Sequence, residues 1–202
     1  MQIRRSSIAA LCFSTLTVLA ASPLLAGDFA LMGSFWDTDV AGNTAGGGVI
    51  LGLPLSKTFA IELRATYFEQ LSDDTLENAF HSHDPVFLKQ GIQALPLEAG
   101  VRFGFAPGQM FRPYVGGGAS YFLLDSDFGE IKDELGYYAA LGATVGDGRG
   151  ADFFFEGVYR KATAHVKIDP EHFSDIDDIN VDPNAALKLD GIGVNAGVRW
   201  TF

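Results

Sequence analysis

The sequence predicts an all-β protein, an eight-stranded antiparallel up-and-down transmembrane β-barrel. Three observations support this prediction. Apolar residues alternate with polar or glycine residues over segments of about ten to fifteen residues, longer than most strands of soluble sheets. Short and long connections follow one another in turn, as in membrane barrels. The polar phase combines glycine with glutamate and arginine and contains almost no lysine, unlike a face in contact with water.

Eight segments show the alternation and are the predicted strands. In chain order they are Phe29–Trp36, Gly46–Leu55, Phe59–Tyr67, Leu95–Phe105, Phe111–Leu123, Leu135–Val145, Phe153–Arg160 and Gly191–Phe202. The pattern is weakest in the first two segments. It is strongest in the last one, where every second residue from Ile192 to Phe202 is apolar. The seventh segment has one exception, Val158, which lies in the polar phase.

The connections between these strands fall into two classes. The short turns are Pro54–Lys57, Ala106–Gln109 and Gly146–Gly150, and the long loops are Glu69–Val86, Asp125–Glu134 and Val166–Asn184. Short turns at one end and long loops at the other are typical of a transmembrane barrel, whose closure satisfies every backbone group in the hydrocarbon. A soluble β-sandwich has the same alternation and is the alternative fold, but it would turn the charged phase toward water.

The composition limits the function. The 202 residues include 25 acidic and 14 basic side chains, with a formal net charge of −11, and 48% are hydrophobic. A general affinity for nucleic acid is excluded, because it requires a basic face. Disorder is excluded as well, because disordered chains lack this apolar content.

Met1–Ala26 is a predicted signal peptide. Two arginines precede an apolar stretch, and a small-residue cleavage site ends at Ala26. Cleavage there removes Cys12, the only cysteine, which fits export without disulfide chemistry. The mature chain, residues 27–202, is predicted to be a single outer-membrane β-barrel domain.

The polar phase is predicted to face the barrel interior. Its charged members are Glu62, Arg64, Glu98, Arg102, Arg112, Glu156, Arg160 and Arg199. Eight strands enclose a space just wide enough for side chains to fill. Arginine can bond carboxylates with two parallel hydrogen bonds, so pairing of these residues would make a charged plug. The alternative is a narrow charged pore whose network opens.

Aromatic side chains are predicted to form two girdles at the membrane interfaces. The outer girdle is assigned to Phe35, Trp36, Tyr67, Phe68, Tyr121 and Phe122. The periplasmic girdle is assigned to Phe59, Phe103, Phe105, Phe111, Phe153, Trp200 and Phe202.

Most of the acidic residues lie in the long connections. The densest cluster is a weak candidate for a divalent cation site: Asp169, Glu171, Asp175, Asp177, Asp178 and Asp182. Hard cations prefer carboxylate oxygen and could bridge these loops to the phosphates of lipopolysaccharide. Ile179 occupies a ligand position of an EF-hand loop, so that motif is absent. The alternative interpretation is that the acidic loops are simply solvated.

A catalytic site is considered at the segment His81-Ser82-His83-Asp84. Nucleophilic catalysis needs the hydroxyl within hydrogen-bond reach of the imidazole, but in an extended chain Ser82 points away from both histidines. His165 and His172 lie near Asp169 and form a second combination of this kind. We predict no catalytic residue and no cofactor, and a lipid- or peptide-acting hydrolase is the third alternative function.

Two stretches carry a resemblance to known families. Asn195-Ala196-Gly197-Val198-Arg199-Trp200-Thr201-Phe202 resembles the terminal signal of bacterial outer-membrane barrels, carried here by Asn195, Gly197, Trp200 and Phe202. Arg112-Pro113-Tyr114-Val115-Gly116-Gly117-Gly118 resembles a strand of the outer-membrane-protein-A-like and opacity-like porin barrels. The resemblance implies a Gram-negative-type outer membrane and recognition of the last strand by the barrel assembly machinery.

The expected function is therefore structural or interactive. The barrel would anchor in outer-membrane lipid and display its acidic loops to lipopolysaccharide, cations or an unidentified surface partner. The first alternative is a narrow cation-preferring porin or small-solute channel, because a negative outer field attracts cations.

Overall fold

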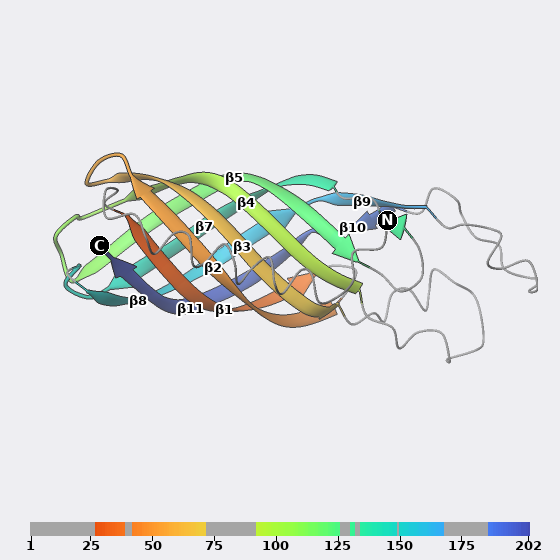
Figure 1. The fold of residues 1–202 in the computed structure, drawn as a ribbon, viewed down its shortest axis with the longest axis horizontal. Coiled ribbons are helices and arrows are strands. Elements are labelled where there is room, and N and C mark those ends of the chain that lie inside the picture. The colour runs from red at the N-terminus through yellow and green to blue at the C-terminus, as the bar shows by residue number, and fades with distance from the viewer. Residues whose placement is uncertain are drawn as a thin grey trace, which may run out of the picture.

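The chain forms a closed antiparallel β-barrel in a computed structural model (Figure 1). The structure describes residues 27–38, 42–71, 92–125, 130–131, 134–148, 150–167 and 186–202. The barrel strands are β1 (Asp28–Thr38), β2 (Gly42–Pro54), β3 (Phe59–Leu71), β4 (Ile92–Gly104), β5 (Phe111–Asp125), β7 (Glu134–Val145), β8 (Ala151–Lys161) and β11 (Gly191–Thr201). Their order around the ring is β1-β11-β8-β7-β5-β4-β3-β2. The predicted fold class is thus confirmed.

Three further short strands lie where the sequence predicts only loops or loop margins. They are β6 (Glu130–Ile131), β9 (Thr163–Lys167) and β10 (Ala186–Lys188), and they form a small sheet in the order β10-β9-β6. β9 follows β8 after the single residue Ala162, and Ala186 of β10 pairs with His165 of β9. The hairpin of β8 and β11 therefore continues beyond the barrel on its long-loop side. The apolar stretches in these segments are too short to predict this extension from the sequence.

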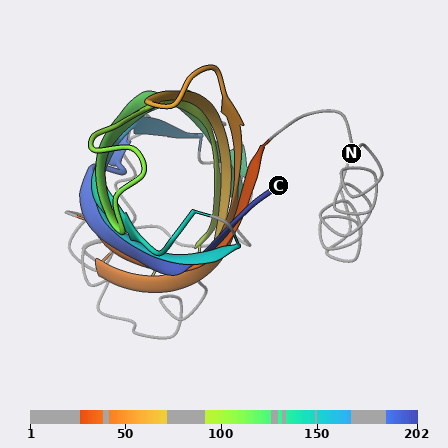
Figure 2. The same ribbon diagram turned by 90° about the vertical axis from the view of Figure 1, so that its left-hand side faces the viewer.

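The first and last strands close the ring. Asp28 of β1 pairs with Thr201 of β11, and the register continues without a shift to Thr38 and Gly191. Beyond the strand ends, the Gly27 and Phe202 backbones exchange two hydrogen bonds of 3.0 Å. Seen from the end with the short turns, the strands form a continuous ring (Figure 2).

Alternation along each strand separates the two faces of the wall. In β8 every second residue is buried and the residues between are exposed. The exposed positions carry large apolar side chains such as Phe153 and Phe155, so the apolar phase is the outer one. Val158, the apolar exception in the sequence pattern, points inward and is 1% exposed. Among the described residues no helix is long and apolar enough to cross a membrane.

The predicted outer girdle is wrong for three of its six members. Trp36, Phe68 and Phe122 are fully buried inside the barrel, whereas their neighbours Phe35, Tyr67 and Tyr121 are exposed outside. Successive side chains of a strand point to opposite faces, so only one residue of each adjacent aromatic pair can face lipid. The predicted periplasmic girdle residues are all exposed: Phe59, Phe103, Phe105, Phe111, Phe153, Trp200 and Phe202.

A charged pair marks the loop-side margin of the outer face. Lys161 follows Tyr159 on the same outward face of β8, and its Nζ is 3.5 Å from Asp190 Oδ2. The polar boundary of the lipid-facing surface therefore lies at this level of β8.

Several segments singled out in the sequence lie outside the described residues. They are the predicted signal peptide Met1–Ala26, the segment His81–Asp84, and the acidic cluster Asp169, Glu171, Asp175, Asp177, Asp178 and Asp182 with His172.

Candidate functional site: the barrel interior

The structure places all eight charged residues of the polar phase inside the barrel. They come from five strands, β3, β4, β5, β8 and β11, and point toward the barrel axis. Two further carboxylates, Asp28 on β1 and Asp152 on β8, join them. Five arginines are thereby matched with five carboxylates in the interior ion pairs.

Arg64 is the centre of the middle cluster. Its Nη2 donates to Glu62 Oε2 at 2.7 Å, and its Nη1 donates to Glu156 Oε1 at 2.5 Å. Glu156 also accepts hydrogen bonds from Tyr114 Oη at 2.9 Å and from Asn195 Nδ2 at 2.8 Å. The side chains of Arg64, Glu62 and Glu156 are all 0% exposed. Both carboxylates are thus held by several donors in a space shielded from solvent, where charge-assisted hydrogen bonds are strong.

A second group lies nearer the short turns. Arg102 Nη2 is 2.7 Å from Asp28 Oδ2, and Arg102 Nε is 3.3 Å from Glu62 Oε1. Arg199 Nη1 lies 3.2 Å from both Asp28 Oδ1 and Glu62 Oε1. Glu62 therefore joins this group to Arg64, and each carboxylate here has more than one arginine partner.

Arg112 ties two turns together at the end of the barrel. Its Nη2 donates to Asp152 Oδ2 at 2.5 Å, and its Nη1 donates to the carbonyl oxygens of Gln109 and Gly146 at 3.0 and 2.7 Å. Gln109 belongs to the β4–β5 turn and Gly146 to the β7–β8 turn. The arginine of the Arg-Pro-Tyr motif therefore joins two turns at the periplasmic end, given that short turns are the periplasmic ones in such barrels.

Glu98 and Arg160 form a separate pair toward the long loops. Arg160 Nε is 2.9 Å from Glu98 Oε1, Ser120 Oγ donates to the same oxygen at 3.2 Å, and both charged side chains are 0% exposed. The Arg160 guanidinium lies 5.8 Å from the ring centres of Trp36 and Phe68. This pair thus lies against an aromatic cluster, which offers a favourable cation–π environment.

Large interior side chains lie against glycines of nearby strands. A Cβ atom on the glycine would approach the large side chain to between 2.6 and 2.8 Å in the following pairs: Gly46 with Phe68, Gly48 with Met32, Gly100 with Tyr138, Gly142 with Tyr114, and Gly191 with Trp36. The glycines of the polar phase therefore make room for the aromatic and aliphatic residues that fill the interior.

Several interior polar atoms have no hydrogen-bond partner among the described residues. They are Asp28 Oδ1, Ser34 Oγ, Trp36 Nε1, Thr66 Oγ1, Tyr138 Oη, Arg160 Nη1, Asn195 Oδ1, Arg199 Nε and Arg199 Nη2. Buried polar groups in native proteins are almost always hydrogen-bonded to protein or ordered water. The packing of the interior is therefore not uniform, and these atoms mark its most polar part.

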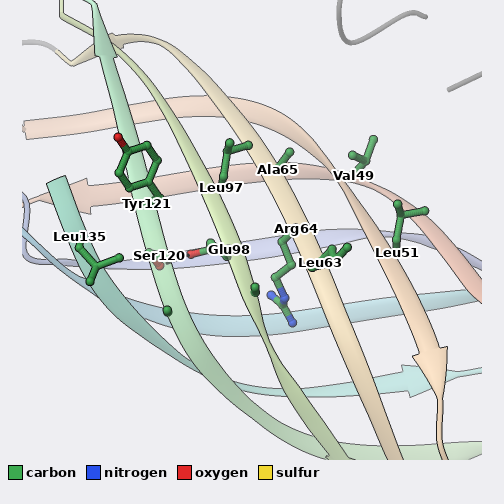
Figure 3. A pocket seen from close by; sticks show the side chains of 12 residues that line it. Val49, Leu51, Leu63, Arg64, Ala65, Leu97, Glu98, Ser120, Tyr121 and Leu135 are labelled. Carbon is green, nitrogen blue, oxygen red and sulfur yellow. Dashed lines mark hydrogen bonds between the residues drawn. The ribbon is translucent and has the colours of Figure 1, made fainter. Parts of the chain in front are cut away.

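A shallow groove of about 440 Å³ lies on the outside of the wall across β2, β3, β4, β5 and β7 (Figure 3). Its floor includes Ala65, Ala99 and Ala119, and its apolar flanks include Leu97 and Tyr121. Arg64, Glu98 and Ser120 border it only from behind, since their side chains bond inside the barrel (Figure 3). The groove is part of the lipid-facing surface and does not reach the interior charges.

Sequence reasoning identified the five interior arginines but missed two of their five carboxylate partners, Asp28 and Asp152. Asp152 lies one residue before the predicted seventh strand, and Asp28 lies one residue before the first. Extending the alternation by a single residue would have placed both inside the barrel. Within the described residues, no group of three His, Cys, Asp or Glu side chains is arranged to hold a metal ion.

The closed ring of antiparallel strands with an apolar exterior and a polar interior defines a transmembrane β-barrel. The family model for the outer membrane protein beta-barrel domain matches residues 6–202, so the chain belongs to this family. The protein is therefore an outer-membrane β-barrel protein.

Solved structures show the same fold. OprG from Pseudomonas aeruginosa is 17% identical with a TM-score of 0.55, and the match covers 88% of this chain and 97% of that chain. Neisserial surface protein A is 14% identical with a TM-score of 0.58, covering 87% and 97%. The Escherichia coli outer membrane protein W is 16% identical with a TM-score of 0.51, covering 89% and 100%. At these identities the likeness concerns the fold alone. No curated protein matches the chain in sequence.

Proposed function

We propose that this protein is an outer-membrane barrel with a closed interior that anchors acidic connections at the cell surface. The observation that carries the proposal is the equal number of arginines and carboxylates in the interior ion pairs, whose central members are fully buried. A selective pore is lined by charges of one sign that face water. Here each charge already has a partner of opposite sign, so the interior presents no ring of unpaired charge to an ion.

The acidic connections are the proposed interaction surface. Most acidic residues of the chain lie in the long connections, on the side opposite the short turns. Divalent cations would bind carboxylate oxygens there and bridge them to phosphates of neighbouring lipopolysaccharide. The barrel itself would then act as the membrane anchor that holds these connections in place.

Planar-bilayer conductance of the refolded mature chain tests the closed interior. A heat-shift gel first establishes that the chain has closed into a barrel, and a fluorescent label establishes insertion. We expect no discrete current steps under either polarity. Reproducible cation-selective steps would replace the anchor with the narrow channel and would place Arg102 and Arg160 on its path.

A further inference from the structure

An aromatic cluster spans the interior at its loop-side end. Trp36, Phe68 and Phe122 come from the last few residues of β1, β3 and β5, three strands that all run toward the long loops. The ring centres of Trp36 and Phe68 are 5.2 Å apart, and those of Trp36 and Phe122 are 6.0 Å apart. All three side chains are fully buried. Three large rings from three parts of the wall thus meet across the interior.

The interior ion pairs become less buried toward the other end. The side chains of Arg112 and Arg102, near the short turns, are 19% and 15% exposed, and Asp28 is 8% exposed. The side chains of Arg64 and Arg160, farther along the axis, are 0% exposed. Solvent therefore reaches the interior from the periplasmic end.

The polar atoms without partners among the described residues continue from that end along β1 and β11. Ser34 of β1 is opposite Asn195 of β11, and Trp36 is opposite Gly193. Ser34, Trp36, Asn195 and Arg199 each contribute at least one such atom. A Cβ at Gly193 would lie 2.7 Å from the Phe35 carbonyl oxygen, 3.2 Å from Val158 Cγ1 and 3.6 Å from Arg160 Nη1, so the wall is closely packed at this position.

Leaving these buried atoms without hydrogen bonds would be energetically costly. Water is the partner that satisfies such groups inside proteins, provided that several polar atoms surround it. The row from Asp28 and Arg199 through Ser34 and Asn195 to Trp36 Nε1 supplies donors and acceptors in succession. At this level the aromatic rings of Phe68 and Phe122 offer no hydrogen bonds, and Arg160 beside them is bonded to Glu98 through Nε and Nη2.

We propose that water occupies the inner face of the β1–β11 pair from the periplasmic end up to Trp36, and that the cluster of Trp36, Phe68 and Phe122 is the barrier of the closed interior. This inference rests on the proposed function, because it assigns the closure to a particular site. A hydrophobic constriction excludes ions by excluding water. The Glu98–Arg160 pair lies against this cluster and the other interior ion pairs lie on its periplasmic side. The salt bridges neutralise the interior charges, while the aromatic cluster blocks passage.

Trp36→Ala tests the barrier in the conductance assay. We expect it to convert a silent barrel into one with reproducible current steps, because the indole is the shared member of both ring contacts. Trp36→Phe keeps an aromatic ring and should stay silent. Phe154→Ala is the matched control: Phe154 is another buried interior ring, 2% exposed, but it lies near the short turns with Ala30, Met32 and Ile50. It too should stay silent.

Silence of Trp36→Ala in a folded, inserted barrel would overturn the barrier, as would equal current from Phe154→Ala. Phe122→Ala gives the same test if the Trp36 variant does not refold. Wild-type current would instead contradict the closed interior itself, so the two failures are distinguishable.

The indole N–H of Trp36 serves as a separate probe for water on the inner face of the β1–β11 pair. In isotope-labelled protein we expect a magnetisation-transfer signal between this proton and water, with an assignment fixed by its loss in Trp36→Phe. Ser34→Leu should weaken that signal by filling the path beside Asn195. Absence of any water contact at the Trp36 indole would overturn the hydrated path.

Discussion

Arg160 and Arg102 both carry a buried positive charge, but their partners differ in number. Arg160 is bonded to a single carboxylate, Glu98, and both side chains are 0% exposed. Arg102 contacts Asp28 and Glu62, and each of these also contacts Arg199. Removing one partner of an isolated buried pair leaves an uncompensated charge, whereas the shared carboxylates near Arg102 keep another arginine.

Arg160→Met should therefore destabilise the barrel more than Arg102→Met. We expect Arg160→Met to lower the free energy of unfolding by about 3–5 kcal/mol, as for other broken buried pairs. Arg102→Met should also lower the urea midpoint, but by less. The measurement is urea unfolding in lipid vesicles, followed by tryptophan fluorescence.

The double variant Arg160→Met with Glu98→Leu is the control for this prediction. Because it removes both charges together, it should recover much of the stability lost in the single variant. Equal losses of stability in the Arg160 and Arg102 variants would contradict this prediction, because the number of charged partners would then have no effect on the cost of removing an interior arginine.

The alternation in the sequence predicts which face a charged residue occupies, but not its partner. Arg102 and Glu98 are neighbours on β4, yet Arg102 bonds Asp28 of β1 and Glu98 bonds Arg160 of β8. Such pairs reach across the interior between strands that are not adjacent. They depend on the diameter and stagger of the closed ring, which no single segment encodes.

Among the elements, β5 shows how glycine permits the curvature of a small barrel. Gly118 faces the interior, and a Cβ there would overlap the Ala99 carbonyl oxygen and the Gly100 Cα of β4. The two strands approach closely on the inside of the bend, so a side chain at this position would push them apart. Gly33 of β1 faces outward, and nothing lies within 4 Å of a Cβ built on it.

Gly118→Ala should therefore impair the barrel, whereas Gly33→Ala should leave it unchanged. We expect Gly118→Ala to lower the free energy of unfolding by about 1–3 kcal/mol, the usual range for overpacking. The folded fraction on a heat-shift gel and the urea midpoint report the effect. A loss of similar size in Gly33→Ala would indicate that backbone freedom, not the contact with β4, explains the role of glycine.

The adjacent aromatic pairs show where element-level prediction fails. Phe35-Trp36, Tyr67-Phe68 and Tyr121-Phe122 each have one ring outside and one inside. The predicted alternation of each strand already places one ring of every pair inside and the other outside, because successive side chains of a strand point to opposite faces. The general preference of aromatic residues for membrane interfaces led to the wrong assignment of the inner three.

At the scale of the whole molecule, the two tryptophans lie on opposite sides of the wall. Trp36 is fully buried inside, and Trp200 is 37% exposed on the outer face, where its ring stacks on Phe29. The chain contains only these two tryptophans. Single-tryptophan variants can therefore report each face separately.

Brominated lipids should quench Trp200 strongly and Trp36 weakly. The variant Trp36→Phe isolates the outer residue and Trp200→Phe isolates the inner one, with fluorescence measured in vesicles of brominated and ordinary lipid. Strong quenching of Trp36 would contradict its interior position and, with it, the aromatic cluster. The unfolded chain in urea is the control, because both residues should then be equally insensitive to the bilayer.

The pairing of β1 with β11 also dictates an order of events. Asp28 and Thr201, which face each other across this seam, lie at opposite ends of the described chain. The ring cannot close until β11 lies beside β1, so before that point the pairing edges of the two seam strands are unprotected. Contacts between such distant residues form slowly, and exposed strand edges promote aggregation meanwhile. The time for which these edges stay unpaired, as well as the stability of the finished barrel, would then determine how much of the chain closes correctly.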